Sequence, residues 1–240
     1  MLPDEVLVRW MAIEDAGPST VARWCERLHP DEIARGGRFR FDADRSAYLG
    51  AHALVRSLLA SAGPFRAEEW RFVSDQRGKP EVDPALASPL RFNLSHCRGL
   101  VAAAVSCRHD VGVDVERCDR PAPVREIARR HFTPDEVALL QPADGGDTFF
   151  RLWTLKEAVI KATGEGLRRP LASFGVALDP IAVTFPGAAG AESAEWQVFQ
   201  TRPTAQHVVA VAVRRVHGPA VTFVPEGVAP DQLASLRRQS

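Results

Sequence analysis

Residues 149–167 read FFRLWTLKEAVIKATGEGL, which sets Lys156, Glu157 and Lys161 into an otherwise apolar helical pattern. The apolar residues predict a buried helix, with Gly164 at the position of its C-terminal cap. Glu157 and Lys161 are four residues apart, so they project from one face of that helix about one turn apart. Such a pair could bind a metal and a phosphate, or it could be an ordinary surface ion pair. The rest of the chain has to decide between these two interpretations.

The bulk composition indicates a globular protein without a global attraction for nucleic acid. Of its 240 residues, 45% are hydrophobic, which is enough for a substantial core. Its 30 basic residues balance its 30 acidic ones, so anion binding has to come from local clusters. The 4 cysteines have no CxxC spacing, which indicates neither a zinc site nor a disulfide framework. The first residues do not form a signal peptide and no segment predicts a membrane span, so we expect a cytoplasmic location.

A short internal repeat predicts two similar halves. The sequence PDEIA at 30–34 recurs as PDEVA at 134–138, and each copy follows a strand-like segment and precedes a longer helix. Proline followed by acidic residues is typical of a first helical turn, where it suits the unsatisfied amides and the positive end of the dipole. The longer helices are expected over 45–62 and 148–163.

Apolar alternation predicts strands in both halves. The expected strands are at 6–13, 70–73, 90–94, 100–105, 111–116, 183–185, 196–199, 207–213 and 221–224. We therefore expect an α+β fold of two similar α+β halves related by a pseudo-twofold axis, with the active site in the cleft between them. The expected boundaries are 1–108 for the N-terminal half, 109–227 for the C-terminal half with the metal site, and 228–240 for a tail.

The predicted strand at 112–116 carries two carboxylates. Asp114 and Glu116 are two residues apart, so their side chains emerge on the same face of the strand. Two neighbouring negative charges need a compensating cation, and carboxylate oxygens suit the hard ion Mg²⁺. The same two residues could instead face solvent or pair with Arg117 or Arg120, and the spacing alone leaves both interpretations open.

Two further polar elements precede this strand. Ser95 and His96 stand at the end of a strand-like segment, where they could bind an anion, although a lone histidine is more often a structural hydrogen-bonding residue. Lys79 lies between Gly78 and Pro80, a tripeptide that by itself predicts only a surface turn.

In this order and spacing, the four elements resemble the 4′-phosphopantetheinyl transferases of the two-halved, surfactin-synthetase-activating type. The resemblance covers about residues 30–167 and is most specific at 112–116 and 153–161. It implies a Mg²⁺-dependent enzyme that transfers the phosphopantetheine moiety of coenzyme A to a serine of an apo acyl or peptidyl carrier protein and releases adenosine 3′,5′-bisphosphate. We expect a monomer, with neither a nucleic acid nor a membrane as partner.

The resemblance implies a role for each charged motif of the C-terminal half. Asp114, Glu116 and Glu157 are similar to the metal-binding carboxylates of the family. Lys161 and Lys156 are expected to contact the diphosphate. Glu157 and Lys161 are the expected catalytic residues: Glu157 as the general base, with Glu116 as the alternative, and Lys161 to offset charge on the leaving group.

The resemblance also implies contacts between the N-terminal half and the nucleotide end of coenzyme A. The expected contact residues are Arg35, Arg38, Lys79, Ser95 and His96. The two arginines match basic residues that the family uses for the 3′-phosphate, whereas Glu32 falls where some relatives have lysine, which puts one contact in doubt. Cys97 follows where relatives often carry serine, and we interpret it as a tolerated small residue and not as a nucleophile.

The identity of the carrier protein is left open by these motifs. We expect polyketide or nonribosomal peptide synthase carriers; the alternatives are a transferase dedicated to fatty-acid synthase or lysine-pathway carriers, and an inactive coenzyme A binding module. The intact set of three carboxylates and Lys161 favours an active enzyme. Candidates for a basic docking strip, or for an ordinary solvated helix face, are Arg125, Arg129 and Arg130.

Overall fold

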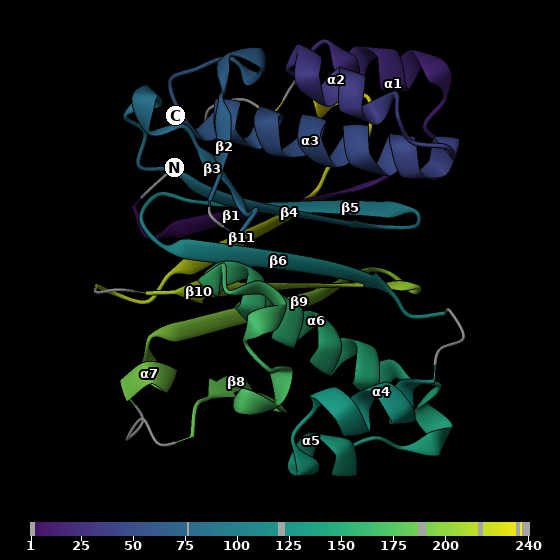
Figure 1. Ribbon diagram of the computed structural model, residues 1–240, viewed down its shortest axis with the longest axis vertical. Coiled ribbons are helices and arrows are strands. Elements are labelled where there is room, and N and C mark those ends of the chain that lie inside the picture. Colours follow the sequence, from purple (N-terminus) through teal and green to yellow (C-terminus); the bar gives the residue numbers. More distant parts are fainter. Residues whose placement is uncertain are drawn as a thin grey trace. The chain divides into compact units, whose positions relative to one another are not determined.

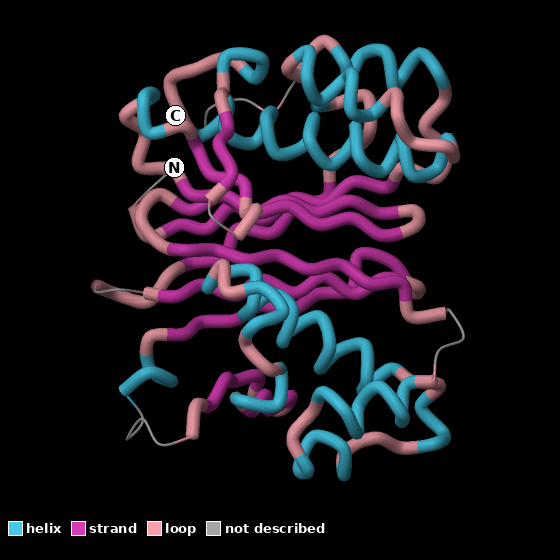
Figure 2. Tube along the Cα trace, viewed as in Figure 1, coloured by secondary structure: helices cyan, strands magenta, loops and turns pink. Residues whose placement is uncertain are grey.

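The chain forms two compact units, each with its own sheet and its own long helix (Figures 1 and 2). The computed structural model describes residues 3–75, 77–119, 123–186, 191–215, 218–233 and 236. Unit 1 comprises Met1–Arg108 and Val221–Ser240, and unit 2 comprises His109–Ala220. The α+β class is therefore as expected from the sequence, whereas the pseudo-twofold axis and the cleft between the halves stay predictions.

Unit 1 contains a four-stranded sheet in the order β11-β1-β5-β4. Its strands are β1 (Glu5–Ala12), β4 (Arg91–Cys97), β5 (Leu100–Ser106) and β11 (Thr222–Gly227). Strand β1 pairs antiparallel with β5 on one side and parallel with β11 on the other. The sequence placed 221–227 in the C-terminal half, and this is wrong because β11 completes the sheet of unit 1.

Three helices cover one face of this sheet (Figure 1). They are α1 (Pro18–Cys25), α2 (Pro30–Gly36) and α3 (Asp42–Ala62). Helix α3 lies on β4 and β5, and α1 and α2 pack on α3. The segment after β11 joins the same core: Leu233 is buried, and the indole Nε1 of Trp24 donates to the carbonyl oxygen of Pro230 at 2.9 Å. The rest of the expected tail, apart from Leu236, lies outside the described residues.

A two-stranded ribbon, β2 (Phe72–Ser74) and β3 (Pro80–Val82), lies between α3 and β4 in the sequence. Its turn contains Lys79, whose backbone amide donates to Oδ1 of Asp75 at 2.8 Å. Gly78 has a φ of 85°, a left-handed conformation that favours glycine. The tripeptide predicted as a turn is therefore a turn.

Unit 2 contains a three-stranded antiparallel sheet in the order β6-β10-β9. Its strands are β6 (Asp110–Arg117), β9 (Trp196–Thr204) and β10 (His207–Arg214), and a separate hairpin comprises β7 (Gly175–Leu178) and β8 (Ile181–Thr184). The helices are α4 (Val124–His131), α5 (Pro134–Ala138), α6 (Asp147–Thr163) and α7 (Ala191–Ala194).

Helix α6 packs across β6 and β10 and is the central helix of unit 2 (Figure 1). Its apolar face, with Phe150, Leu155 and Val159, belongs to one core with Val208 and Ala210 of β10. The helix ends at Gly164, which has a φ of 68° and so takes the left-handed conformation of a C-terminal cap. The predicted helix over 148–163 is confirmed. Within the described part of the chain, no helix has the length and hydrophobicity of a membrane span.

Candidate active site

The site in unit 2 depends on a close approach between α6 and β6. A Cβ atom on Gly112 would lie 2.1 Å from the carbonyl oxygen of Ala158 and 2.4 Å from the backbone nitrogen of Ala162. Real Cβ atoms do not approach backbone atoms so closely, so only glycine lets the helix lie at this depth. Asp114 is two residues further along β6 and therefore projects from the same face, toward α6.

Asp114 and Lys161 form an ion pair across this contact. The ammonium of Lys161 donates to Oδ1 of Asp114 at 2.7 Å. Asp114 is only 5% exposed, whereas Lys161 is half-buried, so the pair lies at the edge of the core of unit 2. Lys161 therefore contacts the first predicted metal ligand and is more than a surface partner of Glu157.

Glu157 lies one helical turn before Lys161 and is half-buried. Burial raises the pKa of the Glu157 carboxyl, the negative charge of Asp114 raises it further, and the positive charge of Lys161 opposes both effects. The two carboxylates therefore interact electrostatically, and the spacing of four residues puts Glu157 on the helix face from which Lys161 reaches Asp114. A raised pKa makes a carboxylate a stronger base than an exposed one.

Glu116 stands two residues beyond Asp114 on β6 and is half-buried. Its neighbour Arg117 forms an ion pair with Asp119, with Nε and Oδ1 at 2.6 Å, and Arg120 lies outside the described residues. Over the described residues, no group of three or more histidine, cysteine, aspartate or glutamate side chains is gathered closely enough to hold a metal.

In their chemistry, the carboxylates at this contact are donors of the kind that a divalent cation binds. Burial and then the negative charge of Asp114 raise the pKa of the Glu157 carboxyl, so a cation between the two carboxylates would be favourable. Glu116 has the strand spacing that puts its carboxylate on the same face as that of Asp114. An oxygen-only set of this kind suits Mg²⁺, which keeps several waters and takes few protein ligands.

Lys156 does not reach this site, which contradicts its expected role as a diphosphate contact. Its side chain is 0% exposed, and its ammonium contacts Oε1 of Glu136 at 2.9 Å. The same ammonium donates to the carbonyl oxygens of Leu171 at 2.8 Å and Phe174 at 2.6 Å. An ammonium has three protons, and these three acceptors account for them. Burial lowers the pKa of Lys156, and the hydrogen bond and charge of Glu136 oppose the shift.

Unit 1 brings two of the predicted nucleotide contacts to one region of α3. The guanidinium of Arg35 lies 5.6 Å from the ring centre of Tyr48, and the ring of Tyr48 lies 4.1 Å from that of His52. Burial lowers the pKa of His52, Glu32 opposes the shift, and nearby His96 adds to it. Arg35 therefore lies near Tyr48, and His96 lies near enough to His52 to affect its pKa. Sequence reasoning missed Tyr48 and His52, although their spacing of four residues on a predicted helix was an available signal.

The other predicted contacts in unit 1 are more scattered. Ser95 and His96 are adjacent on β4 and point to opposite faces of the strand, and accordingly Ser95 is buried whereas His96 is exposed. Arg38 is exposed just beyond α2, and Lys79 is half-buried in the ribbon turn. Cys97 is a free, half-buried thiol.

Glu32 is occupied by a structural contact. Its Oε2 accepts from Nε of the buried Arg56 at 2.7 Å and from the backbone amide of His29 at 2.9 Å. At this position some relatives have lysine, whereas here Glu32 forms an ion pair with Arg56 of the same unit.

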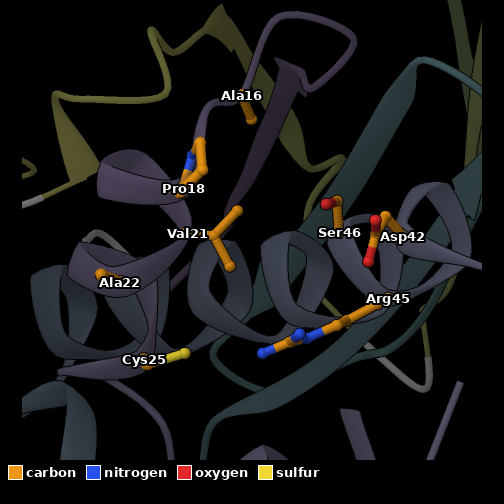
Figure 3. A pocket seen from close by; sticks show the side chains of 8 residues that line it. All are labelled: Ala16, Pro18, Val21, Ala22, Cys25, Asp42, Arg45 and Ser46. Carbon is orange, nitrogen blue, oxygen red and sulfur yellow. The ribbon is translucent and has the colours of Figure 1, made fainter. Parts of the chain in front are cut away.

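A cavity of about 430 Å³ lies in unit 1 between α1 and the first turns of α3 (Figure 3). Ala16, Pro18, Val21 and Ala22 supply its apolar wall. Its polar groups come from Cys25, Asp42, Arg45 and Ser46. None of the predicted site residues lines it, so it is separate from both groups described above.

Comparison with known proteins identifies the family. The model of the 4′-phosphopantetheinyl transferase superfamily matches residues 110–212. The 4′-phosphopantetheinyl transferase HetI of Nostoc sp. is 33% identical over 217 residues, 89% of each chain. A 4′-phosphopantetheinyl transferase of Bacillus subtilis is 35% identical over 59% of this chain and 62% of its own.

The comparison also finds a more distant relative and a solved structure. The L-aminoadipate-semialdehyde dehydrogenase-phosphopantetheinyl transferase of Mus musculus is 26% identical over 91% of this chain and 78% of its own. Among solved structures, the acyl carrier protein synthase of Mycobacterium tuberculosis aligns with 43% of this chain and 94% of its own at 23% identity, with a TM-score of 0.29, which is too low to compare the folds. From the family model and its curated relatives, the chain belongs to the 4′-phosphopantetheinyl transferase superfamily and is an enzyme of this class.

Proposed function

We propose that this enzyme transfers the 4′-phosphopantetheine moiety of coenzyme A to a serine hydroxyl of an apo acyl or peptidyl carrier protein. The observation that carries the proposal is the 2.7 Å pair of Lys161 and Asp114 with Glu157 beside it. Carboxylates for a cation and an ammonium for a diphosphate are the groups that a phosphoryl-type transfer needs. The names of the relatives agree with this chemistry.

In the proposed reaction, the serine oxygen of the carrier forms a bond to the phosphorus that bears the pantetheine arm. The bond from that phosphorus to the bridging oxygen of the diphosphate breaks, and adenosine 3′,5′-bisphosphate leaves with the bonding electron pair. Glu157 takes the serine proton, because it lies on the same helix face as Lys161, the residue proposed to meet the diphosphate. Lys161 offsets the negative charge that develops on the leaving phosphate.

Asp114, Glu116 and Glu157 are the residues that would hold Mg²⁺. When bound, Mg²⁺ supplies Lewis-acid stabilisation of the diphosphate charge. Asp114 also orients Lys161 through their ion pair, so the ammonium is held where the diphosphate has to bind. The protein contributes position and electrostatic stabilisation, and the nucleophile comes from the carrier.

The nucleotide end of coenzyme A is proposed to bind residues of unit 1. Arg35 and Arg38 offer cations for the 3′-phosphate, and His96 is an exposed imidazole near Tyr48 and His52. Lys79 and Ser95 complete the proposed set, although Ser95 would act through the face opposite to that of His96.

Carriers of polyketide or nonribosomal peptide synthases are the proposed partners. The exposed arginines of α4 would meet an acidic carrier surface: Arg125, Arg129 and Arg130. A lysine-pathway carrier is the second candidate, because the mouse relative named above aligns with most of the chain. Comparing the values of kcat/KM on purified apo carriers of each class separates the two.

The transfer itself is tested by measuring the release of its small product, adenosine 3′,5′-bisphosphate. The protein is incubated with coenzyme A, Mg²⁺ and an apo carrier, and adenosine 3′,5′-bisphosphate is quantified by chromatography. We expect release that depends on the carrier and is lost when the carrier serine is replaced by alanine. An inactive coenzyme A binding module would bind coenzyme A and release nothing.

A further inference from the structure

Each unit buries one cation from its long helix among equivalent partners. In unit 1 this residue is Arg56 of α3, which is 2% exposed, and in unit 2 it is Lys156 of α6, which is 0% exposed. Neither residue belongs to the proposed binding groups. A charge in such a position is costly unless it is paired and hydrogen-bonded, so its partners indicate its role.

The acidic partner comes from the Pro-Asp-Glu repeat in both units. Arg56 Nε lies 2.7 Å from Oε2 of Glu32, the third residue of α2, and Lys156 Nζ lies 2.9 Å from Oε1 of Glu136, the third residue of α5. Each glutamate also caps its own short helix, through the backbone amides of His29 at 2.9 Å and Thr133 at 2.8 Å.

The remaining partners of the two cations also correspond. Arg56 donates to the carbonyl oxygens of Ala67 at 2.9 Å and Trp70 at 2.7 Å, in the segment that follows α3. Lys156 donates to two carbonyl oxygens in the segment that follows α6, as described above. An aromatic ring lies against each cation, with Phe72 4.6 Å from the Arg56 guanidinium and Phe174 4.4 Å from the Lys156 ammonium. We call each set of glutamate, cation and two carbonyls a clamp.

We propose that the two clamps are equivalent devices of a duplicated chain and that each positions the proposed binding residues of its own unit. The clamp of unit 2 fixes the rotation of α6 through Lys156. Because consecutive helical residues are about 100° apart, fixing Lys156 toward the core directs Glu157 and, one turn later, Lys161 toward Asp114. Lys156 and Glu136 are therefore positioning residues and not substrate contacts.

The clamp of unit 1 holds α2 against α3 in the same way. It fixes Glu32 of α2 to Arg56 of α3, and Arg35 lies one turn beyond Glu32 over the ring of Tyr48. The departure at Glu32 therefore has a physical reason: the residue corresponds to Glu136 of the other repeat. A buried ion pair is often no more stable than an apolar pair of the same shape, so a role in specifying the arrangement is the reason to retain it.

Two matched double variants test the inference. Lys156→Met/Glu136→Gln replaces the unit 2 clamp by neutral groups of similar length, and Arg56→Met/Glu32→Gln does the same in unit 1. Replacing both partners together avoids leaving one buried charge alone, which could unfold the protein. In the wild-type protein, Oε1 of Glu136 accepts a hydrogen bond from the backbone amide of Val176 at 2.7 Å, and glutamine keeps an oxygen that can accept it.

The first readout is structural and does not depend on activity. In crystal structures of the variants, we expect the 2.7 Å contact between Lys161 Nζ and Asp114 Oδ1 to be lost in the unit 2 variant and kept in the unit 1 variant. A kept contact in the unit 2 variant would overturn the inference, whether or not the wild-type protein transfers phosphopantetheine.

The second readout is kinetic and rests on the proposed function. We expect the unit 2 variant to lose roughly 10-fold or more in kcat with little change in the KM for coenzyme A, because the reacting groups are displaced. The unit 1 variant should instead raise the KM for coenzyme A about 10-fold with little change in kcat, because Arg35 is displaced. Equal losses in both parameters for both variants, together with melting temperatures below that of the wild-type protein, would mean that the clamps only stabilise the fold. An inactive wild-type protein would contradict the proposed function and leave the structural readout to decide on the clamps.

Discussion

The carbonyl oxygen of Ala158 lies 2.1 Å from the point where a Cβ atom of Gly112 would stand, so α6 touches β6 where the strand has no side chain. This contact sets the depth of the helix that carries Glu157 and Lys161. The geometry of the proposed site therefore depends on the lack of a side chain at Gly112, two residues before Asp114.

Gly112→Ala is expected to lower stability and activity together. The added methyl group meets backbone atoms, which cannot rotate away, so α6 has to move from the sheet at a cost of about 2 kcal/mol or more. Equilibrium unfolding in urea measures the loss, and kcat should fall because Asp114 and Lys161 separate. Gly17→Ala is the control: a Cβ there meets nothing within 4 Å, and its effect should stay below about 1 kcal/mol. A Gly112→Ala variant with wild-type stability would show that the helix is not held at this depth.

Glu157→Gln is expected to remove turnover while sparing coenzyme A binding. Glutamine keeps the size of the side chain but cannot accept the serine proton, and general-base catalysis typically supplies about 100-fold or more in rate. Initial rates give kcat, and isothermal titration calorimetry gives the Kd for coenzyme A. Losses of similar size in kcat and in affinity would show that Glu157 binds the substrate and does not act as the base.

Exchanging Glu157 and Lys161 tests whether they act only as a surface pair. The variant keeps both charges at a spacing of four residues, so an ordinary helix pair would tolerate it. Here a glutamate at 161 would face Asp114, and we expect transfer to be abolished by the repulsion and by the loss of the ammonium. The matched control exchanges Glu126 and Arg130, an exposed pair of the same spacing at 2.9 Å on α4, and should leave stability and coenzyme A affinity unchanged. Full transfer by the Glu157/Lys161 exchange variant would restore the surface-pair interpretation.

His52 is expected to make the folded protein less stable in mild acid. Burial lowers the pKa of its imidazole below the ordinary value of 6.5, while Glu32 opposes this effect and Arg56 and His96 add to it. Above pH 6.5 the imidazole is neutral in both the folded and the unfolded chain. As the pH falls below 6.5, the unfolded chain binds a proton more readily than the folded one, so stability is lost.

Urea unfolding at pH 7.5, 6.5 and 5.5 measures this dependence. The variant His52→Gln cannot titrate and should lose less stability over that range than the wild-type protein. Parallel curves for the two proteins would show that the imidazole keeps its ordinary pKa in the fold.

Local patterns in the sequence were sufficient to predict much of the secondary structure of unit 2. Periodicity predicted α6 within one residue of its start, because the alternation of apolar and polar residues is set by the single core that the helix packs on. The expectation that Asp114 and Glu116 lie on the same face of β6 likewise follows from strand geometry alone. Membership of the transferase superfamily, which the motifs indicated, is confirmed by the relatives.

The errors concern contacts between residues distant in the sequence. The family resemblance implies a contact of Lys156 with the diphosphate, but its three acceptors come from Glu136, Leu171 and Phe174, which no local pattern connects to it. The strand expected at 221–224 was assigned to the wrong half for the same reason, since its partner β1 lies near the other end of the chain.

The most direct test of the account is the mass of an apo carrier protein after incubation with coenzyme A and Mg²⁺, measured by mass spectrometry with the wild-type protein and with Asp114→Asn. Asparagine keeps the shape of Asp114 but removes the charge that holds Lys161. We predict one added phosphopantetheine on the carrier serine with the wild-type protein, and a large loss of this product with the variant under the same conditions. No added mass on any carrier with folded wild-type protein, or equal modification by the variant, would contradict the claim that phosphopantetheine is transferred at the site formed by Asp114, Glu157 and Lys161.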